Sequence, residues 1–150
     1  MAKYSGVVRS ITPSTTDDNW ALEAGASESC KIGRIHWGGE ASASTPMHTR
    51  TARSDSQTGA TTVGNVAKLH PNSVTNVVAY ALTFATTQPT LNAGDLFSES
   101  WNSYGGLVIW TATPGVDEFY LLGAATELGI SNRNSVGTGV SSYGTVWEED

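Results

Sequence analysis

The chain has 150 residues, a formal net charge of −6 and a charged fraction of 15%, well below the roughly 25% of an ordinary soluble domain. This length fits one domain with its own core, and the single cysteine, Cys30, excludes an intrachain disulfide. Thr, Ser and Gly are abundant and Lys is rare, which predicts short strands joined by tight turns and little helix.

The charges are unevenly distributed. Residues 71–150 contain Arg133 as their only basic residue, against eight acids. No basic track for phosphates exists, so we expect no nucleic-acid binding. The bulky apolar run Leu107–Trp110 is too short to cross a bilayer, and Met1–Gly6 lacks the apolar core of a signal peptide. We therefore expect no membrane contact and synthesis in a cytoplasm.

Strand candidates recur along the first third of the chain. They are Tyr4–Thr12, Trp20–Ala24 and Ser29–Trp37, with a turn at Ser14–Asn19 before the second. In the third candidate the apolar positions change phase across Gly33, which predicts a β-bulge at that residue.

The middle of the chain is more polar. Met47–Arg53 has little to bury, which predicts an edge strand or a partner-facing strand, and Ser54–Gly64 reads as an exposed loop. Val66–Leu69 is a brief strand candidate. Asn76–Thr86 is a long apolar segment in which Val, Tyr, Thr and Phe favour a strand, although its Ala content also fits a helix.

The last third holds five further strand candidates: Leu96–Trp101, Gly106–Thr113, Glu118–Gly123, Glu127–Asn134 and Tyr143–Glu148. Leu107–Trp110 is apolar on both faces, which predicts a central strand with Trp110 in the core. Pro114-Gly115 is a turn signal, and Gly137–Ser142 predicts a flexible loop.

Eight to ten strands in one chain favour an all-β fold, an antiparallel β-sandwich of jelly-roll-like type. An immunoglobulin-type topology stays open, although the Cys-Trp-Cys framework is missing. We expect a single domain over residues 1–150 with an extended N-terminal segment 1–12. Within that segment, Met1–Ser10 is a candidate strand for a neighbouring subunit.

We find no catalytic signature. His36, His48 and His70 lack metal-ligand spacing, and a site built from His36, His48 and a carboxylate such as Glu40 is a weak alternative. There is no G-x-S-x-G motif, and Cys30 reads as a small buried hydrophobe. Adjacent carboxylates on a strand point to opposite faces, so they make poor acid–base pairs. We expect no catalytic residue, cofactor or metal.

Five tryptophans are the most informative side chains. Trp20, Trp101 and Trp147 have polar neighbours, and indoles with one polar edge are typical of protein interfaces and of sugar-stacking platforms. Capping of the core is the alternative. The interface candidates are Trp20, Trp37, Trp101, Trp147, Arg50 and Arg53.

Four stretches resemble small β-rich proteins of tailed bacteriophages: Ile11–Gly25, Ile35–Arg50, Ser98–Gly115 and Ser142–Glu149. In its short apolar runs separated by Gly, Ser, Thr and Asn, the chain is similar to head decoration or cement subunits. The resemblance implies a virion protein without catalysis, made in a bacterial cytoplasm, that forms a homotrimer and binds the major capsid protein.

Two alternatives remain beside this hypothesis. The first is a carbohydrate-binding module or adhesin that stacks a glycan on Trp20, Trp101 or Trp147. The second is another phage structural component, such as a tail or neck protein or a major head subunit, for which the chain is short. An enzyme is not expected.

Overall fold

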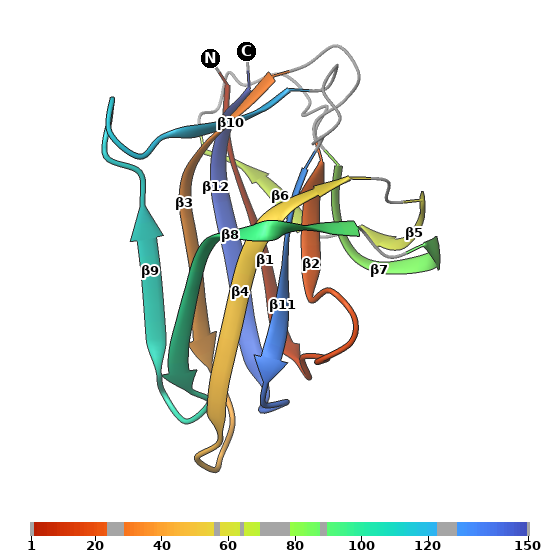
Figure 1. The fold of residues 1–150 in the computed structure, drawn as a ribbon, viewed down its shortest axis with the longest axis vertical. Helices are drawn as coiled ribbons and strands as arrows, with labels where there is room; N and C mark the ends of the chain where they lie inside the picture. The colour runs from red at the N-terminus through yellow and green to blue at the C-terminus, as the bar shows by residue number, and fades with distance from the viewer. Residues whose placement is uncertain are drawn as a thin grey trace.

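The computed structural model of the protein describes residues 2–23, 29–55, 58–63, 65–69, 79–87, 90–122 and 129–149. Every regular secondary-structure element in these ranges is a β-strand, and the strands form two antiparallel sheets packed together (Figure 1). The predicted all-β sandwich is confirmed. Within the same ranges no helix is long and apolar enough to cross a membrane.

Sheet A contains the first and last strands, which pair with each other, so the two ends of the chain lie side by side (Figure 1). Its order is β10 (Phe119–Leu122), β3 (Ser29–Gly39), β12 (Ser141–Glu149), β1 (Ala2–Ile11) and β6 (Asn65–Lys68). A sixth strand, β9 (Leu107–Thr111), pairs with the second half of β3 on the edge whose first half is taken by β10.

Sheet B lies against sheet A and has six strands in one row. Its order is β5 (Thr58–Val63), β7 (Ala79–Thr87), β2 (Trp20–Glu23), β11 (Gly129–Val136), β4 (Pro46–Asp55) and β8 (Thr90–Asn102). Early strands again pair with late ones, because β2 and β4 flank β11.

The bulge at Gly33 is confirmed. Arg34 pairs with Val146 and Ile32 pairs with Trp147, which leaves Gly33 as the extra residue of β3. The change of phase keeps the apolar side chains on one face, since both Ile32 and Ile35 are fully buried. A single residue therefore lets one long strand line the core along its whole length.

Aromatic side chains dominate the core between the sheets. The ring of Tyr4 stacks on Trp147 with 6.0 Å between centroids. The largest side chains that are fully buried are Trp20, Trp37, Trp147, Tyr4, Tyr143, Leu22, Ile32, Ile35, Met47, Leu121 and Ile130.

Two strand placements differ from expectation. β4, which contains Met47–Arg53, is an interior strand between β11 and β8, because the core accepts its Thr49 and Thr51 side chains as buried polar groups. Leu107–Trp110 is part of β9, an edge strand and not a central one, with Trp110 only partly buried. Apolar content alone did not reveal which face of this strand is covered.

One segment expected to be a loop contains a strand, and two predicted strands are found. β5 occupies residues 58–63 of the predicted Ser54–Gly64 loop, of which residues 56–57 and 64 lie outside the described ranges. The segment Ala2–Ile11 pairs with β12 and, over Tyr4–Val7, with β6 of its own chain, and its addition to a neighbouring subunit stays a prediction. β7 covers residues 79–87 of the apolar segment that starts at Asn76, and residues 76–78 are not described.

A buried amide, Asn134 of β11, joins the two sheets. Its Oδ1 accepts hydrogen bonds from Asn19 Nδ2 (3.1 Å), Thr49 Oγ1 (2.8 Å) and the hydroxyl of Tyr143 (3.2 Å). Its Nδ2 donates to the carbonyl of Gly137 (2.9 Å). Tyr143 belongs to sheet A and Thr49 to sheet B, so one side chain links both sheets and the loop after β11.

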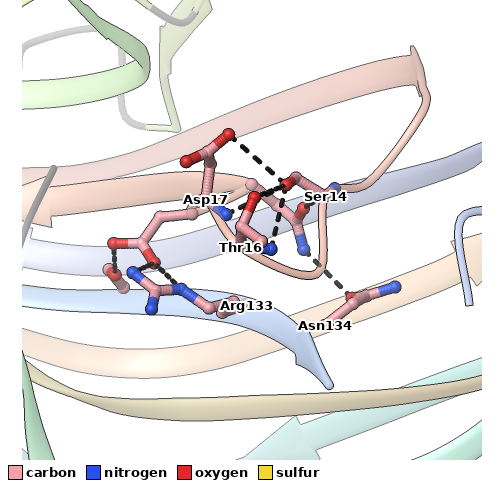
Figure 2. Close-up of polar contacts among 8 residues, drawn as sticks. Ser14, Thr16, Asp17, Arg133 and Asn134 are labelled. Carbon is pink, nitrogen blue, oxygen red and sulfur yellow. Dashed lines mark hydrogen bonds and ion pairs between the residues drawn. The ribbon is translucent and has the colours of Figure 1, made fainter. Parts of the chain in front are cut away.

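A buried ion pair fixes the turn that leads into β2 (Figure 2). Asp18 accepts hydrogen bonds from Ser131 Oγ (2.6 Å) and from Arg133 Nε (2.7 Å). Within the turn, Ser14 Oγ accepts a hydrogen bond from the amide of Asp17 (2.9 Å). Burial raises the pKa of Asp18, although Ser131 and Arg133 both act in the opposite direction. The hydrogen bond from Ser131 and the charge of Arg133 therefore both favour the ionised carboxylate.

Asn134→Ala tests the amide hub. Removal of the amide leaves the buried donors of Asn19, Thr49 and Tyr143 without their acceptor, and we expect a loss of about 3 kcal/mol in the free energy of unfolding. Urea denaturation measures it. Asn102→Ala removes a side chain whose two hydrogen bonds, to Ser44 and from the amide of Tyr104, lie at the surface and should cost about 1 kcal/mol. Equal losses in the two variants would contradict the hub.

Arg133→Ala tests the ion pair, with Arg50→Ala as its control. Arg50 lies opposite Arg133 and pairs with the half-exposed Asp95. We expect Arg133→Ala to cost about 3 kcal/mol at neutral pH and Arg50→Ala under about 1 kcal/mol.

The Arg133→Ala deficit should shrink in acid. Without its cation, the folded-state pKa of Asp18 rises further above its unfolded-state value. A raised carboxyl pKa destabilises the fold as pH rises through the interval between these two values, and the penalty vanishes below both. Denaturation at neutral and acidic pH checks the sign, and a deficit that grows on acidification would refute it.

Candidate assembly interface

β9 alternates between a covered face and an exposed face. Leu107 is 65% exposed and Ile109 is 55% exposed, whereas Val108 and Trp110 pack against the core. Figure 1 shows β9 standing at the border of the sandwich, beyond β3 and β8. Two large aliphatic side chains therefore face solvent on an edge strand, which natural sheets usually avoid.

The hydrogen bonds to β3 also show which main-chain groups of β9 are free. The amide of Gly39 donates to the carbonyl of Gly106 (2.8 Å), and the amide of Ala112 donates to Gly33 (2.9 Å). Antiparallel pairs alternate in bonding, so residues 108 and 110 also direct their main-chain groups at β3. Residues 107, 109 and 111 direct theirs the other way, where no described strand pairs with β9.

An aromatic stack holds β9 in this orientation. The ring of Trp110 stacks on Phe97 of β8 with 5.1 Å between centroids and an interplanar angle of 12°. Phe97 in turn stacks on Trp37 of β3 at 6.0 Å. Because the stack crosses from sheet A to sheet B and back, it fixes the inward face of β9, and Leu107 and Ile109 must point outward.

Other exposed apolar side chains gather along the same stretch of chain. We define the β9 patch as Tyr104, Leu107, Ile109, Val116 and Tyr120, which are 43–81% exposed. The sequence from Tyr104 to Val116 contains no charged residue. In a chain with a net charge of −6, the stretch from Tyr104 to Val116 is an uncharged apolar surface of the kind that marks an interaction site, and Tyr120 borders it with the ammonium of Lys31 6.0 Å from its ring centroid.

Hydrogen bonds hold the turns at the two ends of β9. Asn102 Oδ1 accepts from the amide of Tyr104 (2.8 Å), and Gly105 follows with a φ of 73°. At the other end, Asp117 Oδ1 accepts from the amide of Thr113, and Gly115 has a φ of 74°. Positive φ at both glycines suits turns that few other residues could make. The patch is thus built on ordered backbone.

On the outer face of sheet A, the residues level with Ile109 are uncharged, whereas Arg34 lies opposite Thr111 at one end of β9. Ile109 lies opposite His36 of β3, which lies opposite Gly144 of β12. The imidazole of His36 covers Gly144, where a Cβ would come within 2.4 Å of its ring. Burial, and then the nearby charge of Arg34, lower the pKa of His36. Both effects favour the neutral form of the imidazole beside the patch.

Three of the predicted interface tryptophans lie inside the sandwich. The side chains of Trp20, Trp37 and Trp147 have no exposed surface. Trp101 is partly buried, donates from Nε1 to Thr49 Oγ1 (3.0 Å), and meets Tyr143 edge to face. Only Trp101 of the four offers surface to a partner.

The two predicted interface arginines contact groups of their own chain. Arg50 Nε donates to Asp95 Oδ1 (2.7 Å), and Arg53 Nη1 donates to the main-chain carbonyl of Tyr120 (3.0 Å). The second bond crosses from sheet B to β10 of sheet A. Arg53 therefore links the two sheets close to the β9 patch.

The histidines do not come together. His36 lies on the outer face of sheet A and His48 on the outer face of sheet B, so they cannot share an ion. Glu40 contacts Ser10 and Arg9 in place of His36. Among the described residues, no three His, Cys, Asp or Glu side chains are grouped as metal ligands.

His48 does contact two hydroxyl groups. Its Nε2 lies 2.9 Å from Ser98 Oγ, and its Nδ1 contacts Ser135 Oγ. A serine beside an imidazole is the start of a nucleophilic pair, but here the group on the other nitrogen is a hydroxyl and not a carboxylate. The three side chains come from neighbouring strands β8, β4 and β11, and they act as cross-strand hydrogen bonds.

Sequence reasoning missed the β9 patch because it assigned Leu107–Trp110 to the interior. One signal was available. Tyr104 and Val116 adjoin the turn signals Gly105-Gly106 and Pro114-Gly115, and turns at a surface seldom carry large apolar residues. Apolar residues at both turns indicate a covered surface around this strand.

Comparisons with protein-family models, with curated proteins and with solved structures found no match to this chain. Its function is therefore inferred from its own sequence and from the arrangement of its residues.

Cys30 tests the packing of sheet A next to this edge. Its side chain is fully buried, and burial, followed by the charge of Glu149, raises the pKa of the thiol. We expect no reaction of the native protein with a thiol reagent at neutral pH and full reaction in denaturant. Rapid labelling of the native protein would contradict the packing.

Proposed function

We propose that this protein is a non-enzymatic structural protein of a bacteriophage virion, which decorates or cements the capsid by contacts with its own copies and with the major capsid protein. The observation that carries the proposal is the β9 patch, an exposed apolar surface on an edge strand and its turns, with no charged residue from Tyr104 to Val116. Cement proteins stabilise a shell by burying surface across the joints between subunits, and such a patch supplies that surface.

The fold supports the same role. Pairing of early with late strands, as in β1 with β12 and β2 with β11, is in keeping with a jelly-roll-like wrap. The resemblance of the sequence to decoration subunits implies a trimer on the shell and a virion location. A tail or neck protein is the alternative, in which the β9 patch would contact other subunits of the virion.

The carbohydrate alternative has less support. Trp20 and Trp147, two of its three proposed stacking platforms, are fully buried. Trp101 remains, with its Nε1 already donating to Thr49. A glycan array with a Trp101→Ala control addresses it directly, and we expect no binding.

Co-sedimentation with emptied, undecorated heads of tailed phages tests the proposal. We expect the protein to pellet with heads of its matching type and to raise their resistance to heat, because bound subunits favour the assembled shell. Heads that already carry a decoration protein are the control and should bind less. A protein that leaves every head in a broad panel unbound would refute the proposal.

A further inference from the structure

We propose that β9 pairs with β9 of a second copy, antiparallel and across a two-fold axis at Ile109, so that sheet A of one copy continues into sheet A of the other. This inference deepens the proposed function, since it names the surface through which copies of the protein join. It follows from the hydrogen-bonding phase of β9, the charge around it and the exposed side chains at its ends.

The phase of β9 allows this pairing in one register that uses every free group. Leu107, Ile109 and Thr111 direct their main-chain groups away from β3. With Ile109 opposite its own symmetry mate, Leu107 of each copy lies opposite Thr111 of the other. Each of these pairs can then exchange both N–H···O bonds. A two-fold contact requires a self-complementary surface, and this strand supplies one.

Charge does not oppose a second copy at this edge. The chain carries −6, so two copies repel over most of their surface. The sequence from Tyr104 to Val116 has no charge, and His36 lies opposite Ile109 with a lowered pKa, while Arg34 lies opposite Thr111, away from the axis. Two copies can therefore approach at β9 without like charges meeting at the axis.

The same register explains the exposed residues beyond the strand. It carries Tyr104 of one copy toward the turn at residues 113–117 of the other, where Val116 is 81% exposed. By symmetry the contact occurs at both ends of the paired strands. The contact thus covers Tyr104 and Val116 with each other, in addition to Leu107 and Ile109.

A two-fold contact closes at two copies. It differs from the trimer contact that the resemblance implies, and the species that we predict in solution is a dimer with twice the 15.8 kDa mass of the chain.

Ile109→Lys is the decisive variant, because it places two like charges opposite each other at the axis. The side chain is more than half exposed, so the substitution should not disturb folding. Val7→Lys is the matched control. Val7 lies in the same cross-strand row of sheet A, on the other side of Gly144 and His36, and is 39% exposed. By light scattering we expect the wild type and Val7→Lys to be dimers and Ile109→Lys to be a monomer.

Ile109→Cys gives a second readout that does not depend on destabilising the contact. Residues that exchange both hydrogen bonds have Cα atoms about 5.5 Å apart, within the range of a disulfide. Cys30 is buried, so the new thiol is the one available. Under mild oxidation we expect a covalent dimer from Ile109→Cys and none from Val7→Cys.

A wild-type dimer whose mass Ile109→Lys leaves unchanged would overturn the pairing, as would a trimer insensitive to that variant or a monomer at every concentration. None of these results bears on head binding, which co-sedimentation measures independently. A monomeric wild type that still pellets with heads would remove this inference and keep the proposed function. A wild-type dimer that binds no heads would remove the proposed function and keep the pairing of β9.

Discussion

The stack of Trp110 on Phe97 and of Phe97 on Trp37 is the interaction on which the proposed surface depends. It binds the inward side of β9 to both sheets, and the alternation of a strand then directs Leu107 and Ile109 to solvent. Without the stack, β9 would be a short strand held on one side by β3. With it, the edge becomes an ordered template for another strand.

Polar groups inside the sandwich hold the two sheets in register. The hydrogen bonds of Asn134 connect Thr49 of sheet B to Tyr143 of sheet A, and Arg53 reaches the carbonyl of Tyr120 across the same gap. A buried amide with four hydrogen bonds specifies one arrangement, since any shift of the sheets would leave its partners without those bonds. This polar interior lets a strand as hydrophilic as β4 lie in the middle of sheet B.

The all-β class and the bulge at Gly33 could be predicted because both are local. Turn residues mark strand ends, and a change of apolar phase marks the bulge. The site could not be predicted in the same way. Burial of Trp20 and Trp147 and exposure of Ile109 depend on which strands become neighbours, and pairing between residues far apart leaves no mark in a single sequence. The apolar content of Leu107–Trp110 fits a central strand and an edge strand with exposed apolar side chains equally well.

Amide hydrogen exchange along β9 measures the central claim most directly. In concentrated protein, the amides of Leu107, Ile109 and Thr111 should exchange as slowly as those of Val108 and Trp110, since a second copy bonds the first set and β3 bonds the second. On dilution, only the amides of residues 107, 109 and 111 should become fast. Fast exchange of these three amides at every concentration would show that nothing pairs with this edge.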